Sequence, residues 1–363
     1  MRAVVIDSPG RAGLGTLAEP TLAAGQVLVR VRTVGFCGSD LNTFRGLNPL
    51  VSYPRVPGHE IAAVVEEVGE GVPREISVGA HVTVVPYTAC GQCSACRRGR
   101  VNTCRNNQTL GVQRDGALTE RITLPWQTLL PGEGLDRREL ALVEPLAVGF
   151  HAVARGRVEE GDVVAVIGTG AVGLGAVAGA IRAGATVVAV DVDDAKLTMA
   201  RRAGATHVVN SRSSSLHDRL QELTGGEGPD VVIEAVGLPE TFLASVAEVA
   251  VAGRVVYIGY AKAPVSFDTT QFVRKELDVL GARNATTADF RAVLALLRGK
   301  GFPVADAVTR VVKMDEAADA LRGWDADPAA VTRIHVDLDW ERRHPWLASL
   351  VRSIVLWRWL RHH

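Results

Sequence analysis

The sequence of 363 residues predicts an α/β protein with two domains, one a β-barrel-like unit and the other a doubly wound parallel sheet. Short β-branched runs separated by Gly and Pro fill residues 1–150, as is typical of a barrel. Across residues 151–284, buried-strand runs such as DVVAVIG alternate with alanine-rich stretches, which indicates a parallel βαβ series. Residues 285–338 contain two helical patterns and a strand, VTRIHVDLD, which we expect to pack back on the first domain.

The overall charge argues against nucleic acid as a partner. Forty basic and forty acidic residues cancel, and no long run of one sign is present. The N-terminus enters a strand-like run without the features of a secretory signal, so we expect a cytoplasmic protein. In that reducing compartment, clustered cysteines are more typical of metal ligands or redox groups than of disulfides.

A glycine-rich stretch, VVAVIGTGAVGLGAVAGAIRAG, predicts a dinucleotide site. It places Gly168, Gly170 and Gly173 directly after a strand and at the start of a helix, and Asp191 ends the next strand. These glycines permit a tight turn, a close approach of the pyrophosphate and close packing of the helix, whose N-terminus faces the phosphates. Asp191 would accept hydrogen bonds from the adenosine ribose and repel a 2′-phosphate, which favours NAD over NADP.

Four of the five cysteines fall within fifteen residues, at Cys90, Cys93, Cys96 and Cys104. The spacing C-x2-C-x2-C-x7-C is typical of a tetrahedral zinc site with four thiolate ligands and no open position, which predicts a structural role. A disulfide pair is one alternative. A zinc module for nucleic acid is another, although only three arginines accompany the loop.

A second, catalytic zinc site requires about three protein ligands and an open position. The candidates are Cys37 in GFCGSD, His59 and Glu60 in VPGHEIAA, and Glu144 in LVEPLAVGFHA. Each alone has an ordinary structural explanation, because lone thiols and histidines are common in protein cores. Their combination with a dinucleotide loop favours a metal site.

The order of GFCGSD, PGHE, the four-cysteine loop, EPLAVGFHA, GTGAVG and the strand-ending aspartate resembles the medium-chain, zinc-dependent alcohol and polyol dehydrogenase family over residues 1–338. The resemblance implies a GroES-like catalytic barrel, a Rossmann domain inserted before the last part of that barrel, and two zinc ions per chain. It also implies transfer of a hydride from a secondary alcohol to NAD by a homodimer or homotetramer. Within the family, the chain is similar to sorbitol dehydrogenases and most similar to sugar-acid dehydrogenases such as galactonate 5-dehydrogenase.

Site residues follow from this resemblance. Cys37 and His59 match ligands of the catalytic zinc, Glu60 matches a glutamate that reaches the metal or stands behind it, and Glu144 occupies the position of a third ligand. Ser39 matches the hydroxyl that accepts the substrate proton. The cofactor-binding residues implied are Gly168, Gly170, Ala171, Val172, Gly173, Asp191, Lys196, Gly259 and Arg283.

Two further positions near Ser39 bear on the chemistry. Asp40 matches a carboxylate that orients the histidine ligand. Asn42 stands where many relatives have a proton-relay histidine, and asparagine takes up no proton near neutral pH, so the proton must leave by another route.

The substrate expected is a small polyol or sugar acid. Arg283 and Asn284 follow the last strand of the nucleotide domain, where Arg283 would hold either a substrate carboxylate or the cofactor pyrophosphate. Threonine and simple secondary alcohols are the alternatives within the family. A zinc-free quinone or enoyl reductase should lack the cysteines, and a zinc-binding adaptor without catalytic activity would not need the dinucleotide loop.

Residues 339–363 do not resemble the family ending. Pro345 suits a helix start, and apolar residues follow it at helical spacing between arginines. The segment is too short and too charged to span a bilayer. We expect a helix docked on the body or on a second subunit, and contact with a membrane surface is the alternative.

Overall fold

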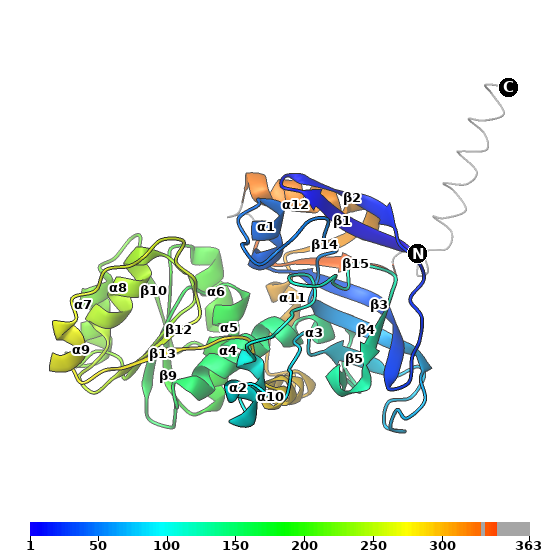
Figure 1. Cartoon of the computed structure of the whole chain (residues 1–363). Coiled ribbons are helices and arrows are strands. Elements are labelled where there is room, and N and C mark those ends of the chain that lie inside the picture. The colour runs from blue at the N-terminus through cyan, green and yellow to red at the C-terminus, as the bar shows by residue number, and fades with distance from the viewer. Residues whose placement is uncertain (328–330, 340–363) are drawn as a thin grey trace.

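The computed structural model describes residues 1–327 and 331–339 (Figure 1). The expectation for the segment 339–363 therefore lies outside the described residues, except for Asp339. The described chain forms a seven-stranded sheet, a six-stranded parallel sheet and a two-stranded ribbon. Within these residues no helix combines the length and apolar character needed to cross a membrane.

The seven-stranded sheet combines the two ends of the described chain. The elements of this part are β1 (Arg2–Ser8), β2 (Arg11–Thr16), β3 (Gln26–Phe36), α1 (Gly38–Phe44), β4 (Glu60–Val68), β5 (His81–Val84), α2 (Ser94–Arg97), η1 (Val101–Thr103), β6 (Arg121–Pro125), η2 (Trp126–Thr128), β7 (Leu129–Pro131), α3 (Arg137–Ala141), α11 (Val304–Ala307), β14 (Arg310–Lys313), η3 (Met314–Glu316), α12 (Ala317–Ala326) and β15 (Ile334–Asp337). The strand order of the seven-stranded sheet is β14-β15-β3-β4-β5-β7, with β6 also paired to β3. β15 runs antiparallel to β3, so the segment after the nucleotide-binding part returns to the first sheet.

Burial in this sheet follows the pleat. Buried residues alternate along β3 because successive side chains point to opposite faces, and the buried face packs against β1, β4 and α12. The register between β3 and β4 shifts at two places, which bends the pair as a barrel wall requires.

The parallel sheet contains the glycine-rich loop. Its elements are β8 (Val163–Ile167), α5 (Ala171–Arg182), β9 (Thr186–Asp191), α6 (Asp194–Arg202), β10 (His207–Asn210), α7 (Leu216–Leu223), β11 (Val231–Glu234), α8 (Pro239–Glu248), β12 (Arg254–Tyr257), α9 (Thr270–Arg274) and β13 (Asp278–Gly281). The strand order β10-β9-β8-β11-β12-β13 is that of a doubly wound dinucleotide-binding sheet, and the order reverses between β8 and β11. Ligands of such sheets bind at the carboxyl ends of the strands at this reversal.

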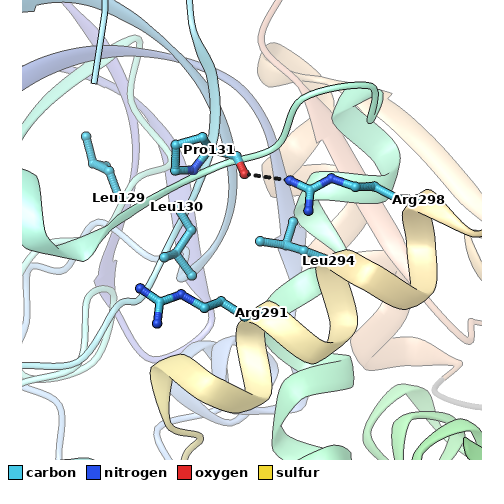
Figure 2. A pocket seen from close by; sticks show the side chains of 6 residues that line it. All are labelled: Leu129, Leu130, Pro131, Arg291, Leu294 and Arg298. Atoms are coloured by element: carbon cyan, nitrogen blue, oxygen red, sulfur yellow. Dashed lines mark hydrogen bonds between the residues drawn. The ribbon is translucent and has the colours of Figure 1, made fainter. Parts of the chain in front are cut away.

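Two helices connect the sheets. α4 (Val143–Arg155) contacts α5 and α10 (Thr287–Arg298) as well as β4 and β5 of the other sheet. Figure 2 shows α10 beside β7, where Arg298 donates a 3.2 Å hydrogen bond to the carbonyl of Pro131. A cavity of about 400 Å³ lies here over buried leucines, and none of the candidate metal ligands lines it. The cavity therefore lies where α10 packs beside β7, separate from the candidate metal site.

Candidate active site

Three kinds of metal ligand meet where β3 ends and β4 begins. Cys37 follows the last residue of β3 and caps the N-terminus of α1, while His59 and Glu60 stand at the start of β4. Because β3 and β4 are antiparallel and pair Gly35 with Glu60, the end of one strand lies beside the start of the other. One sulfur, nitrogen or oxygen atom from each of these three residues lies within 4.8 Å of the other two. This donor set fits a zinc ion.

Glu60 is also paired with a buried arginine. Arg333, the residue before β15, donates to both carboxylate oxygens of Glu60 and, at 3.0 Å, to the carbonyl of Phe36. Both side chains are buried, and a Cβ atom at Gly35 would lie 2.1 Å from Glu60 Oε2, so only glycine leaves room for this carboxylate. Burial lowers the pKa of Arg333, but the interactions with Glu60, Cys37 and Glu144 together outweigh this effect and leave the pKa raised. Glu60 is therefore a member of the metal-ligand cluster whose negative charge is paired with the positive charge of Arg333.

Asp40 lies behind His59. Its Oδ2 accepts a 2.9 Å hydrogen bond from the backbone of Cys37, and its Oδ1 accepts one of 3.3 Å from Gly58. The same Oδ1 is 3.9 Å from Nδ1 of His59, a contact too long for a hydrogen bond, and this nitrogen has no partner among the described residues. Burial lowers the pKa of His59, but Asp40 and the Cys37 thiol raise it well above its usual value. The carboxylate thus favours a positive charge at this ring.

Glu144 lies in the first turn of α4 and does not belong to the 4.8 Å cluster. One of its carboxylate oxygens accepts a hydrogen bond from the Tyr87 hydroxyl, and both side chains are buried. Burial raises the pKa of Glu144, and the nearby Glu60 charge raises it further, while His59 acts in the opposite direction. Helix α4 contacts β4, the strand that begins with Glu60, and the Tyr87 hydrogen bond holds the Glu144 carboxylate.

Ser39 and Asn42 lie on α1, the helix that Cys37 caps. Both residues are partly exposed, and the Ser39 carbonyl accepts a 2.9 Å hydrogen bond from the Thr43 hydroxyl. Ser39 is two residues after Cys37, in the first turn of the helix that Cys37 caps.

The four clustered cysteines also come together. Their sulfur atoms lie within 4.8 Å of one another, around α2 and η1. The sulfurs of Cys93 and Cys96 are 3.5 Å apart and those of Cys93 and Cys104 are 4.0 Å apart, far longer than a disulfide bond. Hydrogen bonds from the backbone of Arg105 and Cys96 lower the pKa of Cys93 to about 6, which favours the thiolate that zinc requires. The group fits a closed zinc site.

The glycine loop has the close contacts that its sequence predicts. Gly168 has φ of 91°, and a Cβ atom at Gly173 would lie 1.9 Å from the Gly168 carbonyl oxygen, so the helix can start only with glycine there. Gly170 caps α5, and a Cβ atom there would meet nothing within 4 Å. Ala171 and Val172 form the first turn of α5. The backbone at Gly170 is therefore accessible to a ligand at the helix N-terminus.

Asp191, the last residue of β9, is hydrogen-bonded to this loop. One carboxylate oxygen accepts from the backbone and hydroxyl of Thr169, at 2.8 and 3.0 Å, and the other accepts from the backbone of Val192 at 2.8 Å. Thr169 is fully buried. The carboxylate thus fixes the glycine loop against the end of the neighbouring strand.

The remaining expected cofactor residues lie on three different segments. Lys196 is in the first turns of α6, and Gly259 packs so closely that its Cβ atom would lie 2.4 Å from the backbone nitrogen of Gly237. Arg283 has an exposed side chain without an ion pair among the described residues. Its carbonyl accepts a 2.8 Å hydrogen bond from Asn102 of the cysteine loop, which ties this segment to that loop.

Comparisons with known proteins agree with this architecture. Residues 23–134 match the alcohol dehydrogenase GroES-like domain, and residues 171–299 match the zinc-binding dehydrogenase family. Sorbitol dehydrogenase of Halalkalibacterium halodurans is 33% identical over 325 residues, which cover 87% of this chain and 94% of that protein. The chain belongs to the zinc-binding dehydrogenases.

Two more comparisons place this zinc-binding dehydrogenase in its family. L-galactonate-5-dehydrogenase of Escherichia coli K12 is 34% identical over 278 residues, covering 77% of this chain and 82% of that protein. The structure of the alcohol dehydrogenase RspB from Escherichia coli CFT073, complexed with NADH, superposes with a TM-score of 0.86 at 28% identity and covers 93% of this chain and 99% of that one. The expected combination of a GroES-like domain with a parallel nucleotide-binding sheet is confirmed.

Sequence reasoning missed two residues of the dehydrogenase site, Arg333 and Tyr87. Arg333 interrupts the apolar strand-like run VTRIHVDLD, and a charge in a buried strand indicates a paired partner. Tyr87 stands in VVPYTAC immediately before the cysteine loop and carries no such signal, because a buried tyrosine is common.

Proposed function

We propose that this dehydrogenase oxidises a secondary alcohol of a polyol or sugar acid with NAD as hydride acceptor. The observation that carries the proposal is the cluster of Cys37, His59 and Glu60 in a chain that also contains the dinucleotide loop. The named activities of the relatives, L-galactonate 5-dehydrogenase and sorbitol dehydrogenase, support this substrate class.

We infer two zinc ions per chain, one held by the four clustered cysteines and one by Cys37, His59 and Glu60, with Glu144 beside it. A zinc ion at the second site would act as a Lewis acid that lowers the pKa of the substrate hydroxyl. Asp40 lies behind His59 and favours a positive charge at its ring, and Arg333 balances the charge of Glu60. The Cys37 group offers three protein ligands and the cysteine loop offers four, so only the former would leave a tetrahedral zinc ion the open position that a substrate requires.

The protein residues then move the proton. Ser39 accepts the proton of the substrate hydroxyl while it passes its own proton on. Because Asn42 cannot accept that proton, it leaves through water, the cofactor ribose or Glu144. NAD supplies the hydride acceptor. Burial raises the pKa of Glu144, which favours proton uptake by this carboxylate.

We infer NAD rather than NADP from Asp191. Its carboxylate already accepts hydrogen bonds from Thr169 and Val192, so a ribose hydroxyl would share or replace one of them. A 2′-phosphate would meet the same negative charge without a compensating arginine in the adjacent position, which is Val192. Lys196 would contact the ribose, and Gly259 would line the cofactor site. A cytoplasmic location and a homodimer or homotetramer stay predictions.

The test is a substrate screen combined with metal analysis. The purified protein should contain about two zinc ions per chain and reduce NAD with sugar acids or polyols, as measured by the absorbance of the reduced cofactor. An enzyme that contains zinc but oxidises only L-threonine or simple secondary alcohols would contradict the substrate class and leave the family assignment intact. The Cys37→Ser variant is the matched control, because it should keep the structural zinc and lose turnover.

A further inference from the structure

A loop that nothing above assigns to the site lies directly against the segment that leads to His59. The backbone nitrogens of Gly116 and Ala117 donate hydrogen bonds of 2.7 and 2.9 Å to the carbonyls of Val56 and Gly58. A Cβ atom at Gly111 would lie 2.6 Å from the Gly58 nitrogen, and one at Gly116 would lie 2.5 Å from the Gly58 oxygen. The loop 110–118 is therefore fixed, on both sides of its tip, to the residue that precedes a metal ligand.

Arg114 lies in this loop between the two glycine contacts. It is two residues from Gly116, so its Cα lies within about 8 Å of that contact. Its backbone carbonyl accepts a 2.8 Å hydrogen bond from Gly111, which closes the turn and sets the position of the side chain. The Arg114 side chain therefore starts from a loop whose backbone is hydrogen-bonded to the segment that leads to His59.

The charge of Arg114 has no carboxylate partner. Its side chain is partly buried, its Nε is buried without a hydrogen bond, and the described residues offer it no ion pair. The neighbouring Asp115 is engaged elsewhere, with Arg55 at 3.0 Å and with the backbone of Val56 at 3.1 Å. Burial lowers the pKa of Arg114, which records the cost of keeping this cation partly out of water.

Other arginines with buried atoms show what Arg114 lacks. Nε is also without a partner in Arg32, Arg55 and Arg333, but each of these side chains is paired with a carboxylate. Buried charges are ordinarily paired in this way, because an isolated one loses hydration without compensation. An unpaired guanidinium on a loop that is tied to the residue before His59 is suited to an anion that arrives with the substrate.

We propose that Arg114 binds the carboxylate of a sugar-acid substrate and so selects acids over neutral polyols. This inference rests on the proposed function and adds the residue that determines substrate charge. Arg283, for which the sequence allowed either a substrate carboxylate or the cofactor pyrophosphate, has an exposed side chain, and its backbone is tied to the cysteine loop rather than to the segment before His59. A carboxylate held in a bidentate manner by Arg114 would orient the chain of hydroxyl groups toward the cluster.

The experiment compares an aldonate, L-galactonate, with the neutral hexitol galactitol, using the zinc-loaded enzyme and NAD. The intact enzyme should favour the acid, and Arg114→Ala should lower kcat/KM for the acid by about ten- to a hundredfold, mainly through KM, because a charge-assisted pair is lost. Oxidation of the hexitol, the KM for NAD and the zinc content should not change. Arg114→Lys should keep part of the preference, since it retains the charge without the bidentate geometry.

Arg74→Ala is the matched control. Arg74 is exposed and without an ion pair among the described residues, and it follows the end of β4 opposite to Glu60. Arg74→Ala should leave kcat/KM unchanged for both L-galactonate and galactitol.

Three results would overturn the inference. They are a preserved acid preference in Arg114→Ala, an equal loss of activity toward both substrates, and an acid preference that disappears in Arg283→Ala instead. An intact enzyme that oxidises galactitol and galactonate equally well also refutes the role of Arg114 and leaves the proposed function standing. An intact, zinc-loaded enzyme that oxidises neither sugar acids nor polyols would show that the proposed function itself has failed.

Discussion

Replacing Arg333 with methionine should destabilise the protein, and zinc should diminish the effect. The change removes the partner of Glu60, which is fully buried and would keep its negative charge without compensation. Removal of one member of a buried ion pair costs about 3–5 kcal/mol of unfolding free energy. We expect about 3 kcal/mol in the chelated protein, because the backbone near Glu60 and water entering the cluster would compensate part of the charge.

A bound zinc ion would replace the lost positive charge beside Glu60. The free energy lost on Arg333→Met should therefore be smaller in zinc-loaded protein than after chelation, and zinc should bind the variant more tightly. In the double variant Arg333→Met with Glu60→Gln, the buried charge is absent altogether, so most of the lost stability should return.

Urea unfolding, followed by tryptophan fluorescence with zinc and with a chelator, measures these differences. The chelator also removes the structural zinc, but it does so in every variant, so that contribution cancels in the comparison. The reasoning would be refuted if Arg333→Met lost the same stability under both conditions, or if the double variant were no more stable than the single one.

Three other predictions concern the zinc sites, the cofactor and the pH dependence. Cys37→Ser should abolish turnover with little change in thermal stability, whereas Cys96→Ser should lower the melting temperature, because a structural metal contributes folding free energy; equal losses of stability would contradict this division. Asp191→Ala should weaken NAD binding and relax a preference over NADP that we expect to be at least about tenfold, and an intact enzyme that works faster with NADP would oppose the assignment. Burial lowers the pKa of His335 to about 3, so the folded state keeps this ring neutral, and stability should be fully present above pH 6.5 and fall below it. His335→Leu should remove up to about 1.4 kcal/mol per pH unit of that acid sensitivity, and urea unfolding between pH 6.5 and 4 would show whether it does.

Local patterns were sufficient to predict the sheets and the glycine loop. The strand-like runs between 162 and 283 correspond to β8 to β13, since buried parallel strands are nearly continuous in apolar residues. In the segment 285–338, however, the sequence indicated only one strand. The structure adds β14 (Arg310–Lys313), which is short, carries charged residues at both ends and is stabilised by its pairing with β15.

The parts of the site that could not be predicted are contacts between residues that lie far apart in the sequence. The spacing of Cys90 to Cys104 is local and could be interpreted directly, whereas Arg333 and Glu60 are separated by 273 residues and meet only because β15 and β4 both lie next to β3. In the same way, the Tyr87 hydroxyl reaches Glu144 across 57 residues because β5 ends beside the start of α4. No periodicity or spacing within one segment contains that information.

The two cysteine groups are suited to different chemistry because their surroundings differ in charge. Four thiolates would surround a zinc ion completely and neutralise it, which suits a structural role and leaves little Lewis acidity. At the other site only one thiolate is present, and the charge of the Glu60 carboxylate is already balanced by Arg333. A zinc ion bound by Cys37, His59 and Glu60 would therefore keep more of its positive charge for a substrate oxygen. With zinc bound, Arg333, one of the two residues missed from the sequence, would help to preserve the Lewis acidity of the metal by balancing the charge of Glu60.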